Sequence, residues 1–505
     1  MRKRGKSRLS SPYKRATRYR LKYTVEEASK RAKKLLPVMY PQLEIALANW
    51  DFLEQLIFPA FEFLGIPESE YDWYMAWVKQ KGEIGLKFDE GTREAEVSVL
   101  TEEFVTRLTT LETPEEVVRE RLAYLEPIVD KWINYMRTGS LKSLGFTAKS
   151  LVATSSWGMS SAYPYQRKAF YAKSLFWVFY TNGSSFVFKT SSDGVAWSDP
   201  TTLKSVGYAE FFSIWFDGTY VHYAVAQGGK LYYRRGFPEA DGSITWSADE
   251  QEIDTVYNKA YYPFVSVDSE GYAWIGYIDY KSTPPTGYCP YVIKSGNNDG
   301  TWGSTPSGFP YLLSITMGAF CVSPIPLTLE KMLVVYVQLF NPVKAQCWDG
   351  SSWLSECSVV SPIQDDYAFS VCAEGDYAHL VFLKQTSYDL IYSMYSYLSN
   401  SWDTEVTVQS SVTIDSYPTL TIYTPEAKLF CFWCGSPLAD HVYFKSCVNG
   451  SWDAEPTDWF NEETELLTAY SELTSFYQNG DDKIGLVYMT KKYSPYYVKF
   501  AHGDP

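Results

Sequence analysis

The spacing of apolar residues along the chain changes near residue 138. Before that point, apolar side chains recur every three or four positions, which predicts amphipathic helices. Beyond a predicted linker at 139–148, they alternate with polar residues, which predicts β-strands. The expected architecture is a multidomain α and all-β protein, with a mostly helical domain over 24–138 and an all-β domain over 149–505.

The helical half contains clear start signals. Thr24 and Glu27 form a capping box that opens a first helix. A segment rich in Tyr and Trp over 69–79 fits another helix. The clearest helix begins with Thr113 as its cap and continues to Gly139. None of these helices has a catalytic spacing, so we predict a docking or assembly domain.

Seven short apolar runs recur along the all-β half, and each suits a strand at the centre of a small sheet. They lie at 177–180, 222–225, 274–277, 334–336, 379–382, 430–433 and 486–488.

A short motif containing tryptophan follows six of these runs. Its fullest form is Ser191-Ser192-Asp193-Gly194-Val195-Ala196-Trp197, in which Asp bonds nearby amides, Gly allows a positive φ and Trp folds back as an apolar plug. Successive tryptophans are spaced by 49, 56, 51, 49 and 50 residues, a period typical of β-propellers. The predicted structural hairpins contain Asp193, Trp197, Trp246, Trp302, Trp353, Trp402 and Trp452.

The motif at 191–197 resembles the Asp-box repeat of sialidase-like propellers, Ser-x-Asp-x-Gly-x-x-Trp, although it is one residue shorter. The resemblance covers about residues 150–505 and implies a β-propeller. It leaves the function open, because such propellers include sialidases, other glycoside hydrolases, carbohydrate-binding proteins and assembly factors.

The ring is expected to close with an N-terminal strand. Ser155-Ser156-Trp157 repeats part of the motif ahead of the first run. The strand after Trp157 is therefore predicted to complete a seventh blade beside the C-terminal strands, which removes both free edges. A ring of six blades is the alternative if Trp157 belongs to the linker.

Charge is distributed unevenly over the chain, whose net charge is −14. Residues 1–34 hold 14 Lys and Arg against 2 acidic residues, which leaves the remainder at −26. The first 22 residues contain ten basic side chains and no acid, which predicts a disordered arm over 1–23 that contacts nucleic acid, anionic lipid or an acidic partner. A solubilising tail is the alternative. The basic residues are Arg2, Lys3, Arg4, Lys6, Arg8, Lys14, Arg15, Arg18, Arg20 and Lys22.

No apolar segment after the arm suits a signal peptide or could span a bilayer. The chain is therefore expected in the cytoplasm or on the surface of a virion or other particle. All eight cysteines fall between Cys289 and Cys447. Cys347 and Cys357 flank one tryptophan hairpin and suit a disulfide across it, but reduced thiols are favoured.

Sialidase activity is not expected from the arginines. Enzymes of that family bind the sialate carboxylate with three arginines from different blades, whereas the all-β half has only Arg167, Arg234 and Arg235. Two of these are neighbours on one predicted strand, where successive side chains point to opposite faces.

The residue patterns give little indication of any other catalytic site or of a metal site. We therefore predict neither a cofactor nor a metal. A glycoside hydrolase needs two carboxylates about 5 to 10 Å apart, and the candidates are Asp279, Asp365, Asp366, Asp389, Asp440 and Glu472. The histidines are expected to be hydrogen-bonded core residues rather than ligands; they are His222, His379, His441 and His502. Cys431 and Cys434 lie three apart in a strand pattern and point to opposite faces, which disfavours a redox or zinc site.

A recurring tyrosine is the better candidate for binding. It stands just before or at the first strand of six predicted blades, and 17% of all residues are aromatic, more than a core needs. We predict that these tyrosines surround the mouth of the central channel as a platform for sugars; the alternative is a packing anchor inherited by duplication. They are Tyr163, Tyr208, Tyr262, Tyr367, Tyr417 and Tyr470.

Three functions remain after these considerations. The first is a non-enzymatic recognition or adhesion protein, whose N-terminal region docks into an assembly such as a virion and whose propeller binds glycan or protein. The second is a glycoside hydrolase acting on a polysaccharide. The third is an intracellular protein-interaction scaffold. The first is preferred, because the two ends differ in charge, the sialidase arginines are lacking and tyrosine is abundant.

Overall fold

The computed structural model divides into two compact units, residues 1–143 and 144–505. In the second unit it describes every residue except 206–210, 285, 317, 319, 449, 463–472 and 491–493. In the first it describes residues 61, 64, 66–71, 73–75, 77, 78, 114, 117, 118, 121, 122 and 125.

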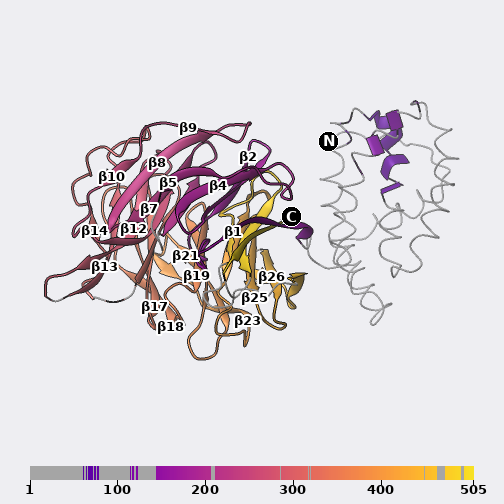
Figure 1. Ribbon diagram of the computed structural model, residues 1–505. Helices are drawn as coiled ribbons and strands as arrows, with labels where there is room; N and C mark the ends of the chain where they lie inside the picture. Colours follow the sequence, from indigo (N-terminus) through magenta and orange to yellow (C-terminus); the bar gives the residue numbers. More distant parts are fainter. Residues whose placement is uncertain are drawn as a thin grey trace. The chain divides into compact units, whose positions relative to one another are not determined.

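The second unit is a seven-bladed β-propeller, which confirms the propeller and the blade number predicted from the repeats (Figure 1). Each blade is an antiparallel sheet, and the seven apolar runs form the second strands of the seven blades. Blade 1 contains β2 (Ala169–Ala172), β3 (Leu175–Thr181), β4 (Ser185–Ser191) and β5 (Thr201–Ser205). Blade 2 contains β6 (Phe212–Phe216), β7 (Val221–Gln227), β8 (Lys230–Pro238), β9 (Ile244–Trp246) and β10 (Gln251–Ile253). Blade 3 contains β11 (Ala260–Val267), β12 (Ala273–Lys281), β13 (Gly287–Lys294) and β14 (Tyr311–Leu312).

The remaining blades repeat this order from the innermost strand outward. Blade 4 contains β15 (Phe320–Pro326), β16 (Met332–Gln338), β17 (Pro342–Trp348) and β18 (Cys357–Pro362). Blade 5 contains β19 (Phe369–Glu374), β20 (Tyr377–Leu383), β21 (Leu390–Ser396), β22 (Ser401–Trp402) and β23 (Val406–Gln409). Blade 6 contains β24 (Thr419–Tyr423), β25 (Lys428–Cys434), β26 (His441–Val448), β27 (Ser451–Trp452) and β28 (Thr457–Asn461), with the short helix η2 (Thr424–Glu426) after β24. Blade 7 contains β29 (Thr474–Ser475), β30 (Ile484–Thr490), β31 (Tyr496–Asp504) and, outermost, β1 (Gly145–Ser155).

The ring closes with an N-terminal strand, but not with the one predicted. The closing strand β1 lies before Trp157 rather than after it, and pairs antiparallel with β31 (Figure 1). Its first residues, 145–148, fall within the stretch predicted as a linker. An outermost strand packs only one side, and along β1 only Val152 and Ser155 are buried. The strand therefore lacks the apolar run that marks inner strands.

The channel along the propeller axis is occupied by the chain itself. Residues 160–168, here called the axial segment, connect blade 7 to blade 1 and are all buried. Gln166 donates to Pro263 O of β11 at 2.7 Å, and Arg167 donates to Val371 O of β19 at 2.8 Å. Further contacts reach Phe212 of β6, Cys321 of β15, Thr419 of β24 and Ser475 of β29. The segment thus touches an inner strand of each of the other six blades.

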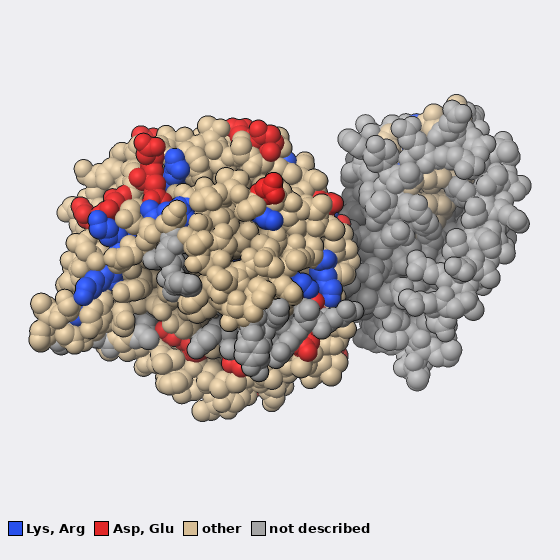
Figure 2. Space-filling model, in the orientation of Figure 1, with Lys and Arg blue, Asp and Glu red and all other residues tan. Residues whose placement is uncertain are grey.

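The innermost strands begin at one face of the propeller, called the start face, and finish at the opposite end face. On the side displayed in Figure 2, charged side chains lie in small mixed groups separated by uncharged surface. Lys204 of β5 in blade 1 pairs with Glu250, just before β10 in blade 2, and Lys230 pairs with Glu252 within blade 2.

Within the first unit, the described residues include the short helix η1 (Glu68–Glu70) and helical positions in both predicted helices, 69–79 and 113–139. Tyr74 and Leu125 are fully buried, and Arg121 lies 3.7 Å from Glu70. Most of the predicted helical domain, the hairpin at 85–98 and the basic arm lie outside the described residues. Among those that are described, no helix is long and apolar enough to cross a membrane.

Candidate functional site

The structure brings three of the predicted tyrosines together on the axis at the start face. Tyr163 stacks on Tyr367 with ring centroids 4.0 Å apart and planes 6° apart. Tyr262 lies 5.8 Å from Tyr163 and 5.7 Å from Tyr367. Each ring comes from a different part of the propeller: the axial segment, β11 and the segment before β19. Tyr208 and Tyr470 lie outside the described residues.

The tyrosines form a packed cluster rather than a ring around an open mouth, because the axial segment fills the channel. Tyr163 is 2% exposed and Tyr417 is 4% exposed, whereas Tyr262 and Tyr367 are half-buried. Burial raises the pKa of the Tyr262 and Tyr367 hydroxyls, so both remain protonated at neutral pH. Two of the four rings therefore keep partial access to solvent.

A second aromatic layer lies one step further into the channel. Tyr165 stacks on Phe369 with centroids 5.1 Å apart and on Phe264 with centroids 6.3 Å apart. These three residues stand two positions after Tyr163, Tyr367 and Tyr262. The repeated aromatic-x-aromatic spacing is the sequence signal for this layer, although the predicted set of tyrosines does not include it.

Carboxyl groups adjoin the tyrosine cluster just before β19 and β24. Tyr417 donates a hydrogen bond from its hydroxyl to Asp365 Oδ2 at 2.8 Å. Asp366 is 4% exposed, and burial, followed by its hydrogen bond with Asp365, raises its pKa to about 8. Burial and the charge of Asp365 also raise the pKa of Asp415, a residue that is not among the carboxylates predicted from the sequence. Asp366 thus carries a proton at neutral pH and can donate it in a hydrogen bond.

Two of the other candidate carboxylates, Asp279 and Asp389, hold local loops. Asp279 is fully buried and accepts hydrogen bonds from the amides of Tyr257 and Lys259, at 2.6 and 2.9 Å. Asp389 accepts from the amide of Ser411 at 2.9 Å. Glu472 lies outside the described residues. Asp365 and Asp366 are therefore the candidates that the structure places beside the tyrosine cluster.

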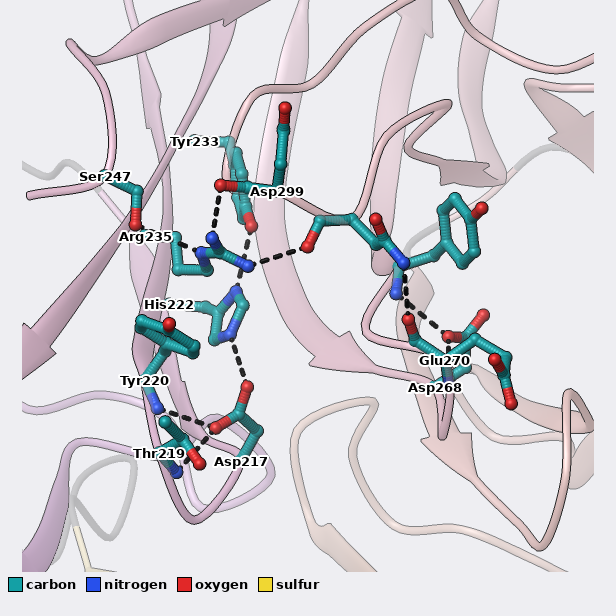
Figure 3. A network of polar contacts seen from close by, with 12 residues as sticks. Asp217, Thr219, Tyr220, His222, Tyr233, Arg235, Ser247, Asp268, Glu270 and Asp299 are labelled. Carbon is teal, nitrogen blue, oxygen red and sulfur yellow. Dashed lines mark hydrogen bonds and ion pairs between the residues drawn. The ribbon is translucent and has the colours of Figure 1, made fainter.

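Two histidines make the same type of contact in different blades. His222 lies between Asp217 Oδ2, 3.0 Å from Nε2, and the Tyr233 hydroxyl, 2.9 Å from Nδ1 (Figure 3). In blade 5, His379 Nδ1 lies 2.9 Å from the Tyr392 hydroxyl. Burial lowers the pKa of both rings, to about 4 for His379. Among the described residues, no group of three or more His, Cys, Asp or Glu side chains is placed to hold a metal ion.

The three propeller arginines have separate partners. Arg235 donates to Asn298 O at 2.7 Å and to Asp299 O, so it joins blade 2 to the tryptophan hairpin of blade 3 (Figure 3). Arg234 packs over the Trp246 ring with its guanidinium carbon 4.4 Å from the ring centroid. Arg167 contacts β19, β24 and β29 in the channel.

The tryptophan hairpins have a repeated local geometry. Asp193 Oδ1 accepts from the amides of Val195 and Ala196 at 2.8 and 2.9 Å, and Gly194 has a φ of 70°. Trp197 is half-buried and donates from Nε1 to Ser150 Oγ of β1 at 2.8 Å. The hairpin of blade 1 is thereby attached to the closing strand of blade 7. All eight cysteines lie among the described residues, and no disulfide joins any of them, including Cys347 and Cys357.

No family model matches the chain, and no curated protein matches it. Solved structures match the propeller. A protein of unknown function from Dyadobacter fermentans is 8% identical with a TM-score of 0.43, covering 72% of this chain and 99% of its own. The polysaccharide lyase Uly1 is 9% identical with a TM-score of 0.42, covering 72% and 100%. The sialidase NanB from Streptococcus pneumoniae, as a K499G mutant, is 9% identical with a TM-score of 0.39, covering 70% of each chain. At this distance, the function has to be inferred from the chain's own residues.

Proposed function

We propose that this protein is a non-enzymatic recognition protein whose propeller binds a glycan, or a glycan-bearing surface protein, at the start face. The observation that carries the proposal is the convergence of Tyr163, Tyr262 and Tyr367, with centroids 4.0 to 5.8 Å apart, beside a carboxyl group. The axis is where side chains from several blades meet, so one ligand there would contact several repeats at once.

The chemistry of this cluster suits a sugar. A tyrosine ring offers an apolar face to the C–H groups of a pyranose, and its hydroxyl offers a hydrogen bond to the sugar hydroxyls. Tyr262 and Tyr367 are the half-buried members, so their exposed edges would form the contact surface. Asp365 adds an acceptor, held in place by hydrogen bonds with the Tyr417 hydroxyl and with the protonated Asp366.

The binding proposal is tested by removing single hydroxyl groups. Tyr262→Phe and Tyr367→Phe keep the rings, so the fold should be retained while one hydrogen bond is lost from each. A hydrogen bond contributes about 0.5–1.5 kcal/mol, so each variant should bind a glycan identified on an array roughly two- to tenfold more weakly. The measurement is a titration of the full chain with that glycan.

Tyr377→Phe is the matched control, because Tyr377 begins β20 at the end face and is 47% exposed. It should bind like the wild type. If both start-face variants bind as tightly as the control, or if no glycan binds the wild type, the proposal is wrong and the cluster is a packing anchor.

A glycoside hydrolase acting on a polysaccharide is the second candidate, favoured by the pKa of about 8 for Asp366, which suits a general acid. Against it, Asp365 and Asp366 are hydrogen-bonded to each other, closer than the roughly 5 Å or more that separates the carboxyl groups of retaining and inverting enzymes. Release of reducing ends from polysaccharides by the wild type, lost in Asp366→Asn, would establish this second function.

The N-terminal part is proposed to anchor the propeller in a larger assembly, such as a virion. In this proposal the basic arm, residues 1–23, contacts nucleic acid or an acidic subunit, and the predicted helical domain docks on other subunits. The split between the basic arm and the acidic remainder supports it. An intracellular scaffold for protein partners is the alternative, distinguished by whether the native protein purifies with a particle.

A further inference from the structure

A pocket opens at the end face of the channel, opposite the start face with its tyrosine cluster. The layer of Tyr165, Phe264 and Phe369 lies between the pocket and that cluster. Its volume is about 320 Å³, large enough for one small ring-shaped molecule. Its walls come from β2, β6 and the segment 477–481 before β30, which belong to blades 1, 2 and 7. Trp215 and Tyr477 line the pocket and pack against each other, with ring centroids 4.2 Å apart.

Arg167 lines the inner part of this pocket and is 2% exposed. Its terminal nitrogens donate to Val371 O at 2.8 Å and to Ser475 Oγ at 3.1 Å. Among the described residues, no carboxylate pairs with the guanidinium, and no protein group accepts from its Nε. Burial lowers the pKa of Arg167 to about 10, so the side chain is still charged at neutral pH.

A buried charge without a counter-ion is unfavourable, because neutral hydrogen-bond acceptors replace only part of its hydration. The acceptors around Arg167 are hydroxyl groups and backbone carbonyls from blades 5, 6 and 7. They hold the guanidinium in place while leaving its positive charge uncompensated. A guanidinium held in this way presents a planar set of donors that matches a carboxylate.

The rim of the pocket carries one charge of each sign. Lys173, in the turn between β2 and β3, and Asp481, between β29 and β30, both line the pocket and are exposed. Lys173 would attract an anion and Asp481 would repel it, so the two rim charges nearly cancel. Arg167 therefore determines which sign of ligand the pocket favours.

We propose that this end-face pocket binds a small organic carboxylate carried on a ring, with the carboxylate on Arg167 and the ring against Trp215 and Tyr477. The site is separate from the proposed glycan site, because the stacked layer of Tyr165, Phe264 and Phe369 lies between them. Binding here neither requires nor excludes binding at the start face.

Calorimetric titration of the full chain with three probes tests the proposal. Benzoate supplies a ring and a carboxylate, benzyl alcohol supplies the ring alone, and inorganic phosphate supplies charge alone. Benzoate should bind with one site per chain and at least tenfold more tightly than either of the others. Equal binding of benzyl alcohol would show a merely apolar pocket, and equal binding of phosphate would show that the ring makes no contribution; either result overturns the assignment.

Three substitutions locate the binding to this pocket. Arg167→Gln keeps donors for the surrounding carbonyls and removes the charge, so benzoate binding should be lost. Lys173→Gln should weaken it about two- to threefold, and Asp481→Asn should tighten it by a similar factor, the size expected for exposed charges. Asp481 has a φ of 48°, which Asn also tolerates.

If Arg167→Gln does not fold, the two rim variants still test the proposal. A damaged fold would weaken benzoate binding in both, whereas the proposal expects weaker binding in Lys173→Gln and tighter binding in Asp481→Asn. Benzoate affinities equal to the wild type in both rim variants would show that the probe binds elsewhere. A folded Arg167→Gln protein that still binds benzoate would show that the buried arginine only connects the blades.

Discussion

Buried polar side chains near the axis and in the blades make the stability of the propeller depend on pH in two opposite ways. Asp366 is 4% exposed and keeps its proton up to a pKa of about 8. His379 is half-buried in blade 5, and burial lowers its pKa to about 4. Between these values, the folded state binds more protons than the unfolded state at Asp366 and fewer at His379. Raising the pH therefore destabilises through the first residue and stabilises through the second.

Asp366→Asn should remove the loss of stability that Asp366 causes as the pH rises. An aspartate in the unfolded chain has a pKa of about 3.9, so the contribution of Asp366 to stability is full below that value and is lost as the pH rises to about 8. The shift spans about 4 pKa units at about 1.4 kcal/mol per unit, so the loss is on the order of 5–6 kcal/mol. The stability of the variant relative to the wild type should rise steadily between pH 5 and pH 8, as measured by urea unfolding.

Comparing the two proteins at each pH cancels the histidine contribution, which both share. Asp199→Asn, at an exposed position, is the control and should keep the wild-type dependence on pH. Parallel curves for Asp366→Asn and the wild type would mean that Asp366 is ionised in the folded protein.

Trp197 connects two blades through a single side chain. It donates to Ser150 and lies edge-on to Phe500 of β31 at 5.3 Å. Trp197→Phe should cost about 1 kcal/mol, the contribution of the hydrogen bond. Trp197→Ala should cost about 3 kcal/mol, at the low end for large aromatics because the ring is only half-buried. Thermal unfolding measures both. A stable Trp197→Ala protein that has lost ligand binding would instead make the hairpin a binding site.

At the scale of strands, β1 closes the ring with very little buried surface. Nine residue pairs join it to β31, interrupted by register shifts after Phe146 and after Leu151. Val152 is 3% exposed and packs with Val498 and Phe500, whereas its neighbour Leu151 is 48% exposed. Closure therefore depends on backbone pairing together with a few side chains on one face.

Val152→Asp and Leu151→Asp form a matched pair that tests this closure. A charge at position 152 would be buried without a partner, so the variant should lose about 3 kcal/mol or more and expose the edge of β31 to other chains. The same charge at position 151 faces solvent and should change stability by less than about 0.5 kcal/mol. Unfolding curves and size-exclusion chromatography measure the two effects. Equal behaviour of the variants would show that β1 is not needed for a closed ring.

The strands that the sequence predicted well are those buried on both sides. The seven apolar runs became β3, β7, β12, β16, β20, β25 and β30, because a strand packed between neighbouring blades must be apolar along most of its length. The strand β1 was placed wrongly because an outermost strand needs no such run. For the same reason, residues 145–148 resembled a linker.

At the scale of the whole molecule, the sequence predicted which tyrosines recur but not where they meet. Their repetition places one tyrosine in each of six blades, which predicts a ring around an open channel. The axial segment breaks that symmetry, since Tyr163 and Tyr165 enter the channel and contact aromatic rings from blades 3 and 5. The end-face pocket has no such signal in the sequence, because Arg167 and the other residues that line it come from three segments far apart in the chain.

The two parts of the chain are predicted to work independently, so removal of residues 1–22 should leave the propeller intact. Ten basic residues without an acid cannot bury enough apolar surface to fold alone. The truncated protein should therefore keep the unfolding temperature of the propeller and its glycan affinity, while its incorporation into the native assembly falls.

The partner of the arm follows from the treatment that releases the full-length protein. Salt weakens every contact of a basic arm, whether with nucleic acid, lipid or the acidic remainder of a neighbouring chain, so it cannot identify the partner. Nuclease can: release of the full-length protein would identify nucleic acid, and retention would leave protein or lipid. If the truncated protein assembles as well as the full-length one, the arm serves only to keep the chain in solution, and the anchoring role passes to residues 24–138.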